Sequence, residues 1–127
     1  MSNSKEYAFD VVAGSSPLHI ACFNSFIDVV RCLLKHKANI NMAKEDGTTP
    51  LFNACEEGHE SIVQLLLDNR ADTQICRLGG KSPSDIATYN GHESVVIMLR
   101  KYIEETTKNY AISTAVMVPP NGENLKV

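Results

Sequence analysis

The chain contains no tryptophan, few cysteines and no long apolar run. Its four cysteines form no Cys-x-x-Cys pair, and its four histidines lack zinc-ligand spacing, so we expect neither a metal site nor a cofactor. The longest apolar run, residues 95–99, is far shorter than the roughly 20 residues that a membrane helix needs. No apolar stretch follows the first residues, so no signal peptide is expected. Reduced thiols in the cytoplasm or nucleus are the simplest reading of the cysteines.

Signals for catalysis are also missing. The sequence has no G-x-S-x-G, no phosphate-binding loop and no H-E-x-x-H. Glu56 and Glu57 lie close to His59, but neighbouring residues on a helix point in different directions, so they form no acid–base pair. We therefore predict that the protein is not an enzyme. The net charge of −3, with scattered Lys and Arg, gives no indication of nucleic-acid binding.

The sequence does contain a repeat with a period of 33 residues. Residues 14–19, 47–52 and 80–85 each begin with glycine and carry a hydroxyl residue followed by proline at the same positions. Ala21, Ala54 and Ala87 continue the register. A fixed period of this length describes a stack of similar units, each too small to fold alone.

Helix signals fall at the same place in each unit. Ser16, Thr49 and Ser82 each precede a proline, so three short helices should begin at those prolines, capped by the hydroxyl groups. Second helices are expected at about 27–36, 60–69 and 93–103, where apolar residues recur at helical spacing, and the last could continue to about Lys108. Polar loops over 39–46 and 72–79 connect the units.

Turn signals separate the two helices of a unit. Gly58 and Gly91 should supply left-handed backbone there. Lys37 and Arg70 stand where a glycine would end a second helix, and each should cost about 1 kcal/mol if its φ is positive.

These registered copies resemble the ankyrin repeat, whose pattern runs roughly G-x-T-P-L-H-x-A-A-x-x-G-H-x-x-x-V-x-x-L-L-x-x-G-A. The resemblance covers residues 14 to about 102. It implies an all-α ankyrin-repeat solenoid of stacked helix-turn-helix units with β-turn loops. We expect an N-terminal extension or partial repeat over 1–13, repeats over 14–46, 47–79 and 80–105, the last resembling a capping repeat, and a largely disordered tail over 106–127. Either residues 1–13 cap the first repeat, or this chain is the end of a longer array.

The resemblance implies a protein-interaction module that binds through its loops and first helices, and that is a monomer unless the array is truncated. The contact positions that it carries over are Ser15, Phe23, Asn24, Glu45, Asp46, Thr48, Glu56, Glu57, Leu78, Lys81, Tyr89 and Asn90. The middle of this set is acidic, so we expect a protein partner with a basic surface or segment, and neither nucleic acid nor membrane. Readings without a binding role stay open: the carboxylates are solvated surface charge, Phe23 with Phe26 shields the open end of the stack, and Tyr89 is an exposed helix-end residue.

Two further interpretations stay open. The first is a structural or targeting fragment of a larger repeat protein. The second is modification by another enzyme, because Asn41 matches the loop asparagine that is hydroxylated in related repeats. His19, His59 and His92 are expected to be structural hydrogen-bonding residues in a fold of this kind.

Overall fold

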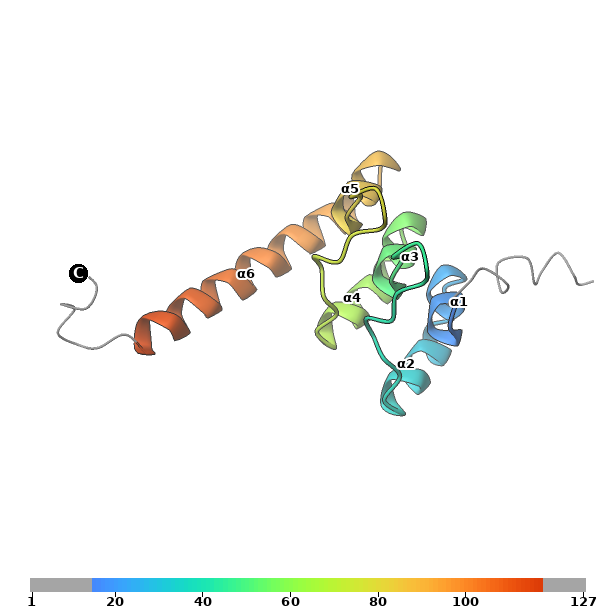
Figure 1. Ribbon diagram of the computed structural model, residues 1–127, viewed down its shortest axis with the longest axis horizontal. Coiled ribbons are helices and arrows are strands. Elements are labelled where there is room, and N and C mark those ends of the chain that lie inside the picture. Colours follow the sequence, from blue (N-terminus) through green and yellow to red (C-terminus); the bar gives the residue numbers. More distant parts are fainter. Residues whose placement is uncertain (1–14, 118–127) are drawn as a thin grey trace, which may run out of the picture.

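The computed structural model describes the backbone of residues 15–117 and the side chains of residues 15–109. Within that part the chain forms helices and no strand, as expected. The helices are α1 (Pro17–Phe23), α2 (Ile27–Lys35), α3 (Pro50–Glu57), α4 (Glu60–Asp68), α5 (Pro83–Tyr89) and α6 (Glu93–Met117). The first helices α1, α3 and α5 pack in one row and the second helices α2, α4 and α6 in another (Figure 1). The predicted all-α stack of helix pairs is confirmed.

Each first helix begins where the sequence predicted it would. The Ser16, Thr49 and Ser82 hydroxyl oxygens accept backbone N–H groups of the first turn at 3.3, 3.1 and 3.0 Å. Proline follows at once, where its missing N–H costs no helical hydrogen bond. Three repeats therefore start with the same backbone geometry.

Left-handed residues end the helices. Gly58 and Gly91 have φ angles of 74° and 77°, and Ser25 takes the matching position in the first repeat at 64°. Lys37 and Arg70 have φ angles of 70° and 66°, so the expected strain at these two positions is present. Each costs about 1 kcal/mol relative to glycine.

The core is a column of small and branched residues between the two rows. Ala21, Ala54 and Ala87 are buried in register, and so are Leu66 and Leu99. Alanine at this position lets neighbouring first helices approach closely. The middle repeat is the most deeply buried, since repeats cover it on both sides.

All four cysteines are free thiols. Cys22 and Cys55 are buried one repeat apart, and burial raises the pKa of each thiol to about 12. They therefore stay protonated and fill the core as small apolar groups.

Helix α6 is longer than predicted. The sequence predicted an end near residue 103, or near Lys108 for a longer helix, and a largely disordered tail from 106, but the helix continues to Met117 and extends beyond the stack (Figure 1). No glycine or proline lies between Glu93 and Met117, so nothing in the backbone stops the helix there. Residues 118–127 and 1–14, including the expected N-terminal extension, lie outside the described residues. No helix within the described part is long and apolar enough to cross a membrane.

Gly58 and Gly91 offer a matched test of how tightly repeats stack. A Cβ on Gly58 would lie 2.6 Å from His92 Nδ1, whereas a Cβ on Gly91 meets nothing within 4 Å. Gly91→Ala should thus cost only the left-handed strain, about 1 kcal/mol, and Gly58→Ala about 2–3 kcal/mol because His92 must also move. Urea unfolding of both variants measures the difference. Equal losses would show that the clash is relieved without cost.

Candidate functional site

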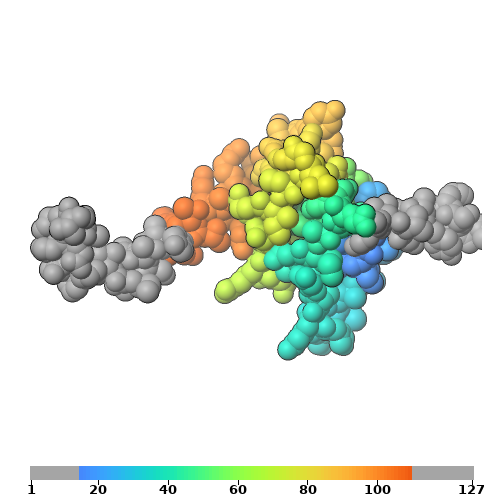
Figure 2. Space-filling view, viewed as in Figure 1, coloured from blue at the N-terminus to red at the C-terminus, as the bar shows by residue number. Residues whose placement is uncertain are grey.

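Two loops project from the same side of the stack. We call residues 39–46 and 72–79 the first and second fingers. They lie side by side (Figure 2), and Leu78 N donates to Asp46 O at 2.8 Å. Farther down, Asp72 N donates to Asn41 Oδ1 at 2.9 Å. The two fingers therefore form one connected surface.

An open groove of about 190 Å³ lies where the fingers meet the first helices. We call it the concave groove. Its α1 side is made by Ser15, His19, Ile20 and Phe23, and its α3 side by Asn53 and Glu56. The first finger adds Lys44 and Asp46, Thr48 lies shortly after that finger, and the second finger adds Arg77.

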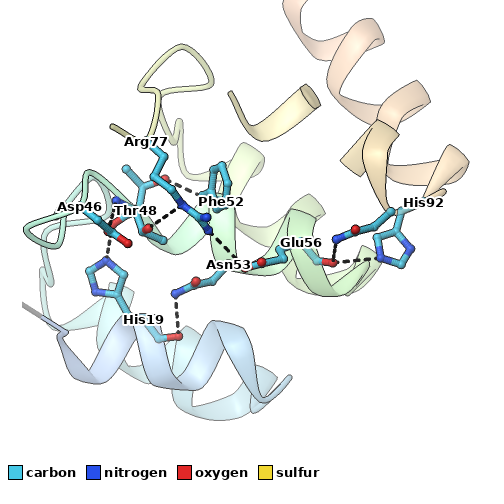
Figure 3. A network of polar contacts seen from close by, with 10 residues as sticks. His19, Asp46, Thr48, Phe52, Asn53, Glu56, Arg77 and His92 are labelled. Atoms are coloured by element: carbon cyan, nitrogen blue, oxygen red, sulfur yellow. Dashed lines mark hydrogen bonds and ion pairs between the residues drawn. The ribbon is translucent and has the colours of Figure 1, made fainter. Parts of the chain in front are cut away.

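Arg77 reaches back from the second finger across the middle repeat (Figure 3). Its guanidinium lies 4.1 Å from the centroid of the Phe52 ring, Nε donates to Thr48 Oγ1 at 3.2 Å, and Nη2 lies 3.6 Å from Glu56 Oε1. The Phe52 ring is buried, and no imidazole is present there to bond the next finger. Arg77 instead ties the second finger to the first helix of its own repeat.

His19 makes the corresponding connection in the first repeat. Its Nε2–H donates to Thr48 O at 2.9 Å, and its Nδ1 accepts from Ser16 N at 3.1 Å. A backbone N–H can only donate and a carbonyl can only accept, so these partners fix the neutral tautomer. Burial lowers the pKa of His19, and the positive charge of Lys44 adds to this, while the hydrogen bond to Thr48 opposes it.

The other two structural histidines bond backward. His59 Nε2 donates to Phe23 O at 2.9 Å, and His92 Nε2 donates to Glu56 O at 3.0 Å. Asn90 Nδ2 donates to the same Glu56 carbonyl oxygen at 2.9 Å. These histidines therefore hold repeats together, and none of them faces a second catalytic group.

Charge in the groove is balanced. Partial burial tends to raise the pKa of Asp46, but hydrogen bonds from Thr48 and the charges of Arg77 and Lys44 outweigh it, so that pKa is lowered. Glu56 faces Arg77. Of the four carboxylates in the middle of the predicted contact set, Asp46 and Glu56 thus lie in the groove, together with two cations.

The predicted contact residues fall into two groups. Ser15, Phe23, Asp46, Thr48 and Glu56 come together in the groove. The others surround it or lie apart on the same set of loops and helix ends: Asn24, Glu45, Glu57, Leu78, Lys81, Tyr89 and Asn90. Thr48 is 2% exposed and serves the groove through its hydrogen bonds: its Oγ1 accepts from Arg77 Nε, and its backbone N–H donates to Asp46 Oδ1.

Sequence reasoning missed Arg77 and Asn53. Arg77 could have been suspected because Phe52 replaces the histidine of the pattern and leaves the next finger without a bond. Asn53 stands in register with Ile20 and Ile86. A polar residue at a position that is apolar in the other repeats could have marked it as a candidate site residue.

A larger hollow, about 350 Å³, lies at the α5–α6 end and is lined by residues such as Gly91, Val96 and Ile97. Gly58, the equivalent of Gly91, is covered by His92 of the next repeat. The hollow is therefore the surface on which a further repeat would stack, left uncovered at the end of the described array. Among the described residues no group of three or more His, Cys, Asp or Glu could hold a metal ion.

Comparison with known families agrees with this geometry. The family model for ankyrin repeats matches residues 3–76 and 46–110, with three copies. A search of curated proteins gives no match. The family match spans most of the chain and confirms the resemblance found in the sequence.

Arg77 should contribute measurably to stability. Arg77→Ala removes a ring contact, a hydrogen bond and a partly exposed ion pair, so we expect a loss of about 1–2 kcal/mol in the free energy of unfolding. Arg100→Ala, at an exposed position on α6, should change it by less than about 0.5 kcal/mol. Chemical denaturation of the two variants gives the comparison, and similar effects would contradict a bridging role for Arg77.

Stability should fall on mild acidification because of His19. Its pKa in the folded chain lies below the ordinary value, so below about pH 6.5 the unfolded chain binds a proton that the folded chain does not. The free energy of unfolding should then decrease from pH 7 toward pH 5, by at most about 1.4 kcal/mol per pH unit for this group.

His19→Phe is the control, since Phe52 occupies the same position in the next repeat. It should flatten the pH dependence even though it lowers stability at pH 7. Asp46 and Asp85 also have lowered pKa values, but their contribution is lost only below about pH 4. An unchanged slope in His19→Phe would exclude His19 as the source.

Proposed function

This chain belongs to the ankyrin-repeat family, and on that premise we propose that it is an adaptor, scaffold or inhibitor that binds a partner protein through the concave groove and its surroundings. Ankyrin repeats generally mediate protein–protein interactions, and the family is typically non-catalytic. Free thiols fit a reducing compartment, so we place this activity in the cytoplasm or nucleus.

One observation carries the proposal. Large side chains on the fingers and first-helix ends point outward and take no part in stacking: Leu78 is 72% exposed and Tyr89 77%. Lys81 Nζ lies 4.9 Å from the centroid of the Tyr89 ring, so this aromatic is held on the surface. Exposed apolar groups beside polar ones are typical of contact residues.

Partner chemistry follows from the charges around the groove. Glu45 and Glu57 are exposed and lie outside it, and the chain carries a net charge of −3. Such carboxylates attract a basic surface at long range and favour its encounter. We propose a basic protein partner, bound by a monomer of this chain.

The alternative is a structural or targeting fragment of a longer array, which the open hollow at the α5–α6 end would suit. Hydroxylation of Asn41 belongs to the same alternative. Its Oδ1 accepts the bond from Asp72 N, so a modifying enzyme would have to separate the two fingers. This favours a structural role for Asn41 in the folded chain.

A comparative pull-down with quantitative mass spectrometry tests the binding face. Glu56→Arg reverses a charge in the groove and places it beside Arg77, so partners bound there should be lost. Glu104→Arg, at an exposed position on α6, makes the same charge change away from the groove and should retain them. Circular dichroism melts first establish that both variants fold.

Salt dependence adds a second readout. Binding to a basic partner should weaken as salt shortens the Debye length from about 10 Å at 0.1 M. A partner list unchanged in Glu56→Arg, or lost equally in Glu104→Arg, would rule out the groove as the binding face. If Leu78→Ala and Tyr89→Ala each lose the partners while Glu56→Arg keeps them, the binding face lies on the second finger and the end of α5 instead.

A further inference from the structure

Asn53 is a polar residue in a position that the stack otherwise fills with isoleucine. One period before and after it lie Ile20 and Ile86. Asn53 is only 4% exposed, and a buried amide without full hydrogen bonding destabilises a fold. Stacking alone gives no reason for an asparagine there.

The Asn53 amide is only half satisfied. Its Nδ2 donates to His19 O at 3.4 Å, which fixes the orientation of the amide because a carbonyl accepts only from the nitrogen. Its Oδ1 accepts no hydrogen bond from any residue between 15 and 109. Asn53 lines the concave groove between α1 and α3 (Figure 3), so this free acceptor is offered to a ligand there.

Charges around Asn53 determine which ligand fits. Glu56, three residues later on α3, lies on the same helix face, and Asp46 approaches from the first finger. Arg77 and Lys44 oppose these two carboxylates. A cationic group would gain from the carboxylates but meet two like charges, and an anionic group could not donate to Asn53.

A neutral group with both a hydrogen-bond donor and an acceptor meets no like charge and can still donate to Asn53. Its N–H would donate to Asn53 Oδ1, and its carbonyl oxygen would accept from Arg77 or Lys44. A carboxamide has this pattern, and the methylene groups of a glutamine or asparagine side chain would contact Ile20.

We propose that the concave groove recognises a glutamine or asparagine side chain of the partner protein, with Asn53 as the specificity-determining residue. The inference rests on the proposed function, since it names what the same groove accepts. The exposed carboxylates outside the groove then serve encounter with a basic surface, and the groove itself selects a neutral amide.

Selection of random displayed peptides against the full chain tests this. Binders that Glu56→Arg abolishes and Glu104→Arg retains should share a glutamine or asparagine. Replacing that residue by leucine, glutamate or lysine should weaken binding about tenfold or more, because the groove's polar groups lose their partner.

Asn53→Ile gives the complementary variant. It installs the residue found at the matching positions of the other repeats, so the chain should fold, and it should weaken the selected peptides about tenfold. Asn109→Ile, at an exposed position on α6, should leave their affinity unchanged.

The outcomes separate the two proposals. Groove binders that carry no shared glutamine or asparagine, or that bind Asn53→Ile as well as the parent chain, overturn the carboxamide inference and leave the binding face intact. Binders that require a shared lysine or arginine overturn it in favour of a cation. If every selected peptide ignores Glu56→Arg, the proposed function fails together with the inference.

Discussion

Hydrogen bonds that cross from one repeat to the backbone of its neighbour are the constraint on which this stack depends. Apolar burial drives the repeats together but does not fix their register, because alanine and leucine surfaces can slide against one another. The imidazole of His19 reaches forward to Thr48 O, and those of His59 and His92 reach backward to Phe23 O and Glu56 O. Each bond joins an imidazole of one repeat to a backbone carbonyl of the next or the preceding one. The fingers keep their spacing because these bonds hold the repeats that carry them.

The middle repeat lacks the forward bond of this kind, because Phe52 replaces the histidine. Arg77 of the second finger instead stacks on the buried Phe52 ring and bonds the Thr48 hydroxyl, which holds this finger against the first helix of the same repeat. This substitution brings a cation into the groove and pairs it with Glu56. A change that preserves stacking has thereby also changed the charge of the binding surface. Stability and recognition are coupled at this one residue.

The starts of the helices could be predicted from the sequence, because a hydroxyl residue before proline has nearly the same effect wherever it occurs. The length of α6 could not, since Thr106, Thr107 and the serine and threonine that follow have only modest helix propensity and no capping residue marks the end. In the site, the sequence located carboxylates such as Asp46 and Glu56. It did not reveal that Arg77 faces them, since that depends on how the second finger folds back over Phe52.

Separation of charge between the groove and its surroundings gives the surface two distinct properties. Carboxylates in water, such as Glu45 and Glu57, act over a Debye length and mainly raise the rate of encounter. Inside the groove, Asp46 and Glu56 are already matched by cations, so their long-range effect is small and their hydrogen bonds are directional. Discrimination between ligands then depends on whether each polar atom in the groove finds a partner, because an unpaired buried group costs more than a surface charge gains. The amide of Asn53, buried and with one hydrogen bond, is a group of the groove to which this cost applies.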